Sequence, residues 1–158
     1  MTLTTHAAIG ATLGSIIGNP VLGFFLGLIS HFLVDMIPHG DNNFLDEYKK
    51  GQKKRLGKAY VSVDAAIAII FLMSIVSGRP QNDTTNLAFS AAVIGSILPD
   101  LLVGLKELFP KNTFLRSFYK IQFFFHDCLS RLYGDTKLTY ALGGQAIFIL
   151  VLMHYFIP

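Results

Sequence analysis

The segment 30–41 (SHFLVDMIPHGD) combines an apolar run with two imidazoles and two carboxylates. His31 and Asp35 are four residues apart, so a helix would place both side chains on one face. His39 and Asp41 follow the apolar run directly. Imidazole and carboxylate groups together are ligands for divalent ions such as zinc or manganese. The segment therefore predicts a metal site, with His39 and Asp41 beside it as candidates for acid–base catalysis or contact with a phosphate.

Further ionisable residues lie in other apolar segments, where a charged side chain is costly unless it is paired or neutralised. Each has an ordinary alternative, such as a buried histidine paired with a carboxylate or an aspartate that caps a helix. A bound divalent ion would neutralise the acids and supply a metal-activated water as nucleophile. The donors are numerous enough for two ions. The predicted metal ligands are His6, His31, Asp35, Asp64, Asp100 and His126.

The composition of the chain is typical of a membrane protein. Hydrophobic residues make up 52% and charged residues 15%, whereas soluble domains contain about 25% charged residues. The formal net charge is only +3, and six of the 13 basic residues lie in one stretch, which indicates membrane topology and not a nucleic-acid surface. The lone Cys128 excludes an intrachain disulfide and a zinc site built from cysteines.

The hydropathy pattern predicts the helices that must position these groups. Crossing a bilayer takes about 20 apolar residues, and four segments reach or approach that length, the first being somewhat short. They are Val21–Ile37, Ala59–Ser77, Asn86–Leu105 and Leu138–Ile157. Two more helices are predicted at Leu3–Gly18 and at Thr113–Tyr133, of which the second is amphipathic. The expected fold is all-α, an integral membrane bundle of about six helices, four to six of them spanning, in one domain over residues 1–158.

Glycines at four-residue spacing predict close contacts between helices, because small residues let helix backbones approach one another. Asn19-Pro20 predicts a tight turn between the first two helices. The spaced glycines are Gly10, Gly14, Gly18, Gly23 and Gly27.

The predicted loop 38–58 concentrates basic residues. By the positive-inside rule this loop and the N-terminus lie in the cytoplasm, which predicts a multi-pass protein of the cytoplasmic membrane. Followed from that side, four helices bring their polar residues to one layer near the cytoplasmic face. The basic residues of the loop are Lys49, Lys50, Lys53, Lys54, Arg55 and Lys58.

An early histidine (His6), a Leu-Pro-Asp run ending at Asp100 and a later helical histidine (His126) resemble motifs of the YdjM-like group of membrane-bound metal-dependent hydrolases. The segment HFLVDMIPHGD is similar to segments of small bacterial membrane proteins of this kind. The resemblance covers most of the chain through short motifs. That group continues its Leu-Pro-Asp run with further acidic and histidine residues, whereas here Leu-Leu-Val-Gly follows, so only Asp100 and His126 carry over, with His6 a weaker match. The resemblance implies metal-dependent hydrolysis.

These observations predict a membrane-embedded metal-dependent hydrolase that uses zinc or manganese. A site inside the membrane suits an amphiphile, so the expected substrate is a phosphoester of a lipid or lipid-linked carrier, reached from the cytoplasmic side. The expected partners are the bilayer and this substrate, not a nucleic acid. Two alternatives stay open. One is a small cation- or proton-coupled transporter or carrier subunit, and the other is a structural membrane protein with buried salt links.

Overall fold

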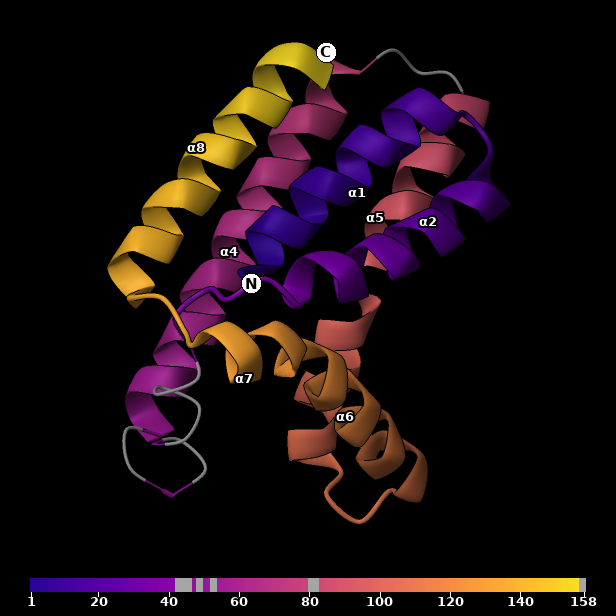
Figure 1. Ribbon diagram of the computed structural model, residues 1–158. Helices are drawn as coiled ribbons and strands as arrows, with labels where there is room; N and C mark the ends of the chain where they lie inside the picture. Colours follow the sequence, from indigo (N-terminus) through magenta and orange to yellow (C-terminus); the bar gives the residue numbers. More distant parts are fainter. Residues whose placement is uncertain (42–46, 48–49, 52–53, 80–82, 157–158) are drawn as a thin grey trace.

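The computed structural model describes the chain except residues 42–46, 48–49, 52–53, 80–82 and 157–158. Within this part of the chain there are seven helices and no strand (Figure 1), which confirms the all-α prediction. Several positions of the predicted basic loop, among them Lys49 and Lys53, lie outside the described residues. The helices are α1 (Leu3–Ile17), α2 (Pro20–Asp35), α4 (Lys54–Gly78), α5 (Asp83–Leu108), α6 (Thr113–His126), α7 (Cys128–Tyr133) and α8 (Leu138–Phe156).

Three helices are long and apolar enough to cross a membrane: α4 over Arg55–Gly78, α5 over Asn86–Leu108 and α8 over Leu138–Phe156. The first predicted span is shorter than expected, because α2 has 16 residues and ends at Asp35. At 1.5 Å per residue it is about 24 Å long, less than the hydrocarbon core of a bilayer. Pro38 lies just beyond this end, and proline disfavours helical backbone in the residue before it.

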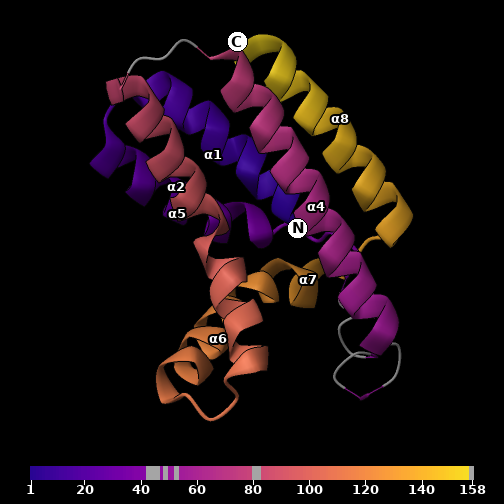
Figure 2. The same ribbon diagram turned by 180° about the vertical axis from the view of Figure 1, so that it is seen from behind.

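Helix α1 is the centre of the bundle. It packs against α2 and α5 on one side and against α4 and α8 on the other, as the two opposite views show (Figures 1 and 2). Ala7, Ala8 and Ala11 on α1 are completely buried. By contrast, α4 and α8 expose large apolar side chains such as Ile70 and Ile147, as expected for helices that face lipid. Helix α6 packs against α5 and α2 at the end of the bundle where α4 begins (Figure 1).

The prediction of close helix contacts at glycines is confirmed, and the shared partner is α5. A Cβ atom on Gly27 would lie 2.2 Å from the Ala92 carbonyl oxygen, and one on Gly10 would lie 2.8 Å from Val93 Cα. Gly18 serves differently: it ends α1 with a φ of +64°, a left-handed conformation that glycine adopts without a Cβ penalty. The α1–α2 hairpin and α5 therefore pack backbone to backbone, which sets the spacing between their polar side chains.

A methyl group at this contact is expected to force α2 and α5 apart. A Cβ atom on Gly95 would lie 2.1 Å from the Phe24 carbonyl oxygen, whereas one on Gly104 of the same helix meets nothing within 4 Å. We expect Gly95→Ala to lower the free energy of unfolding by about 1–3 kcal/mol. Gly104→Ala should leave it unchanged or raise it slightly, because alanine favours helix. Unfolding in mixed detergent and dodecyl sulfate, followed by circular dichroism, compares the two, and equal stabilities would contradict this packing.

Candidate metal centre

The C-terminal half of α2 carries the first two predicted ligands into the interior. His31 and Asp35 lie one turn apart on the same buried face, 0% and 3% exposed. The Nδ1–H of His31 donates to the Ser96 carbonyl oxygen at 2.8 Å, one turn before Pro99 inside α5. This hydrogen bond places the ring proton on Nδ1, so the lone pair of His31 is on Nε2, which faces the site.

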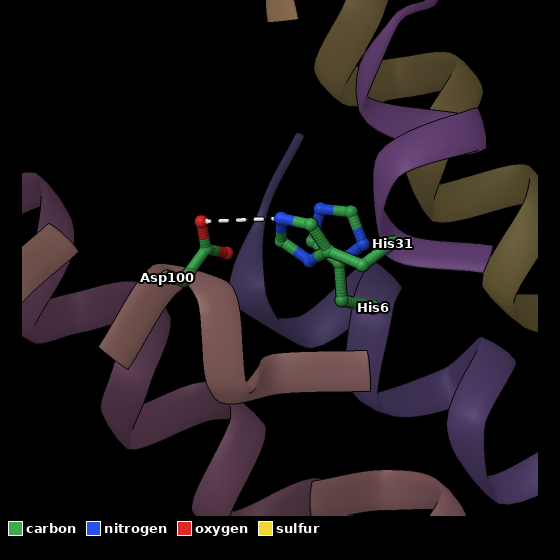
Figure 3. Close-up of side chains that lie close together, drawn as sticks. All are labelled: His6, His31 and Asp100. Carbon is green, nitrogen blue, oxygen red and sulfur yellow. Dashed lines mark ion pairs between the residues drawn. The ribbon is translucent and has the colours of Figure 1, made fainter. Parts of the chain in front are cut away.

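A first group of donors comprises His6, His31 and Asp100, from α1, α2 and α5 (Figure 3). Their ligand atoms all lie within 4.8 Å of one another. The rings of His6 and His31 stack with centroids 4.0 Å apart, and His31 Nε2 lies 3.8 Å from Asp100 Oδ1. His6 is 1% exposed, yet neither of its ring nitrogens has a hydrogen-bond partner among the described residues. A buried polar group normally has a partner, and a cation in this group would supply one.

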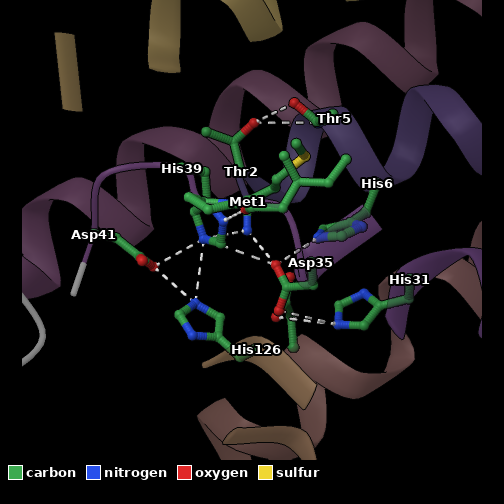
Figure 4. Close-up of polar contacts among 12 residues, drawn as sticks. Met1, Thr2, Thr5, His6, His31, Asp35, His39, Asp41 and His126 are labelled. Carbon is green, nitrogen blue, oxygen red and sulfur yellow. Dashed lines mark hydrogen bonds and ion pairs between the residues drawn. The ribbon is translucent and has the colours of Figure 1, made fainter. Parts of the chain in front are cut away.

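A second group comprises Asp35, His39 and His126, all buried and also within 4.8 Å through their ligand atoms. Asp41 borders this group, with Oδ2 at 3.2 Å from His39 Nε2 and 3.3 Å from His126 Nε2 (Figure 4). The structure therefore places His39, predicted as a catalytic residue, among potential metal donors. Asp41 is partly exposed at the edge of the same group.

The carboxylate of Asp35 lies between the two groups. Its Oδ1 is 3.4 Å from His6 Nε2 and 3.8 Å from His39 Nε2, and its Oδ2 is 3.9 Å from His31 Nε2. The Met1 amino group donates to this Oδ1 and lies 2.7 Å from His39 Nε2 (Figure 4). An amino group thus lies among the donor atoms of the second group.

Three of the histidines are fixed in the same way. Besides His31, His39 Nδ1 is 2.7 Å from the Ile37 carbonyl oxygen and His126 Nδ1 is 2.9 Å from Asp127 Oδ1. A ring N–H that donates to a carbonyl or carboxylate oxygen holds the tautomer and orientation of a metal-binding histidine. All three rings therefore present Nε2 to the site as the atom that would bind an ion.

His126 and Asp41 lie outside the three candidate spans. Burial by itself would lower the pKa of His126, but the hydrogen bond to Asp41 and the negative charges around the ring raise it to about 9. Burial would likewise raise the pKa of Asp41, but hydrogen bonds from His126 and His39 hold it below its usual range. An ion at His126 Nε2 must displace this proton, so metal affinity is expected to increase with pH up to about 9.

Asp64, the remaining predicted ligand, belongs to neither group. Its carboxylate accepts hydrogen bonds from the Leu3 backbone N–H at 2.6 Å and from the Thr4 hydroxyl at 2.7 Å, both in the first turn of α1. The first N–H groups of a helix have no partner within the helix, and an acidic side chain at that end is favourable. Asp64 therefore fixes the start of α1 on α4, at Leu3 and Thr4, three and two residues before His6.

Sequence reasoning missed three residues that shape the site. Gln122 reaches both donor groups, and its spacing of four from His126 in an amphipathic helix was a usable signal. Asp127 pairs with Arg131 at 3.0 Å and also holds His126. Asp135 accepts a hydrogen bond from the Gly40 N–H at 2.7 Å and so anchors the loop that carries the second group's histidine.

The predicted helix over 113–133 is interrupted at Asp127, which ends α6 and precedes α7. His126 is therefore the last residue of α6, at the same end of the bundle as the loop that follows α2 (Figure 1).

Comparison of the chain with protein-family models, curated proteins and solved structures finds no match.

Proposed function

We propose that the chain is a membrane-embedded metal-dependent hydrolase with two divalent ions, zinc or manganese. His6, His31 and Asp100 would hold one ion, His39 and His126 the other, and Asp35 would contact both. The observation that carries this proposal is the shared orientation of three histidines, each held through Nδ1 by an oxygen so that Nε2 faces the centre. Ions there would polarise a phosphoryl oxygen and activate water for attack.

The same proposal assigns roles to residues at the rim of the centre. Asp41 is 23% exposed and Asp100 31% exposed, so both can meet a substrate. Asp41 would accept a proton from the attacking water once ions at His39 and His126 have replaced the hydrogen bonds that lower its pKa. Because Asp100 belongs to the apolar span of α5, a substrate with an acyl or prenyl chain could remain in the bilayer while its head group reaches the ions. We therefore favour a phosphoester of a lipid or lipid-linked carrier.

We propose that the centre lies on the cytoplasmic side of a cell membrane, together with the N-terminus. The start of α4 and the turn between α5 and α6 lie at one end of the molecule (Figure 1). The basic residues Arg55 and Lys58 lie at the first, and Lys106 and Lys111 at the second. Such a concentration of basic residues is typical of the cytoplasmic side.

The decisive experiment measures bound metal and hydrolysis on detergent-purified protein. Wild type is expected to contain up to two equivalents of zinc or manganese and to release phosphate from dioleoyl phosphatidate in mixed micelles. His31→Gln should lose metal and activity. His154→Gln is the matched control, since His154 is exposed on α8. No metal in wild type, even after zinc or manganese is added, would reject the hydrolase, and bound metal without hydrolysis of any phosphoester would favour the carrier alternative.

A further inference from the structure

Gln122 of α6 is the one side chain among the described residues whose amide nitrogen contacts donors of both groups. It is 3% exposed. Its Nε2 lies 2.8 Å from His31 Nε2 and 3.0 Å from Asp35 Oδ2. Because His31 Nδ1 holds the ring proton toward the Ser96 carbonyl, Nε2 of His31 accepts from the amide. The amide hydrogens therefore occupy the same lone pairs that an ion in the first group would use.

The other end of the same amide is unsatisfied. Gln122 Oε1 is buried and has no hydrogen-bond partner among the described residues. A half-turn about the last side-chain bond exchanges the oxygen and the nitrogen without moving anything else. In the turned orientation the oxygen would face the lone pairs of His31 and Asp35, which is repulsive unless a cation lies between them. The preferred orientation of the amide thus depends on whether an ion is present.

We propose that Gln122 is an exchangeable metal ligand. In the ion-free site its amide nitrogen donates to His31 and Asp35 and holds the two donors in place. When an ion enters the first group, the amide turns and its carbonyl oxygen joins the ligands. Amide carbonyl oxygen suits manganese and other oxygen-preferring ions better than soft ones. This role rests on the proposed metal centre. It predicts that the site binds ions that prefer nitrogen and sulfur ligands less tightly than ions that prefer oxygen.

Two substitutions at this position test whether the Gln122 carbonyl oxygen binds the ion or whether the amide only competes with the ion for the lone pairs of His31 and Asp35. Gln122→Glu keeps the shape and places an oxygen toward the ion in either orientation, so we expect Mn²⁺ to bind at least about tenfold more tightly. Gln122→Met keeps the length and removes the carbonyl oxygen, so Mn²⁺ should bind on the order of tenfold more weakly, the lower range for losing a supporting group at a metal site. Both constants are measured by Mn²⁺ electron paramagnetic resonance on the full chain in detergent.

Gln145→Met is the matched control, since Gln145 is also a buried glutamine, but its Oε1 accepts from Thr2 and Thr5 and not from the donor groups. Its Mn²⁺ affinity should equal that of wild type, and thermal unfolding of each variant shows that it is folded. If wild type binds Mn²⁺ and Gln122→Met binds it equally or more tightly, the ligand role is overturned while the metal centre stands. If wild type binds neither Mn²⁺ nor Zn²⁺, both fall together.

Discussion

Replacing Asp35 with asparagine is expected to abolish binding of both ions. The Asp35 carboxylate is the only one in the described residues that lies within 4 Å of histidines from both groups. Asparagine keeps the shape but loses the charge and one acceptor oxygen. Loss of a group that merely supports a ligand weakens metal binding by about 10–100-fold, so loss of a shared ligand should exceed about 100-fold for each ion. Plasma mass spectrometry of the purified variant measures the loss.

Asp64→Asn is the control for this substitution, because it makes the same chemical change nearby. Asp64 accepts from the first turn of α1 and belongs to neither group. We expect Asp64→Asn to keep both ions and to lose about 1 kcal/mol of stability, the usual effect of weakening a helix cap. If Asp64→Asn lost metal and Asp35→Asn kept it, the assignment of the two residues would be reversed.

Replacing Asp41 with asparagine is expected to reduce hydrolysis of dioleoyl phosphatidate by about 10²–10⁴-fold, the usual contribution of a general base. The variant should retain its metal, because the Nε2 atoms of His39 and His126 remain fixed through their Nδ1 contacts. Asparagine cannot accept a proton at neutral pH, whereas the side chain of Asp41 is ionised and reachable from outside.

The ratio of metal content to activity decides the role of Asp41. Glu107→Gln is a suitable control, since this exposed carboxylate pairs with Lys106 away from the centre. It should leave both quantities unchanged. If Asp41→Asn lost one ion together with its activity, Asp41 would be a ligand and the proton acceptor would have to be sought elsewhere.

The pattern of apolar and small residues along the sequence predicted much of the fold. The apolar segments marked the helices, and the four-residue spacing of His31 and Asp35 correctly predicted that both side chains share one buried face. The glycine spacing predicted the backbone contacts but not α5 as their partner, because spacing on one helix says nothing of which helix packs against it. The break at Asp127 was also missed, since the amphipathic pattern continues across it.

Which residues belong to the site depends on contacts between helices, and a short sequence pattern does not specify these contacts. Asp64 was predicted to lie in the same layer as the other ligands, but its carboxylate accepts hydrogen bonds from the first turn of α1 instead. His39 was predicted as a catalytic residue beside the metal site, and the anchoring of Gly40 on Asp135 brings it among the donors. Gln122 carries no charge, so a search for ionisable groups in apolar segments passes over it.

The donor residues of the centre are synthesised at different times, because they are far apart in the sequence. Helices α1 and α2 emerge first, carrying His6 and His31, but both are shorter than the other apolar helices and pack against α5, which follows much later. The last donor, His126, comes still later, at the end of α6. A nascent chain that stops before α6 carries all three donors of the first group but lacks His126, so the second group is completed only after residue 126 has been translated.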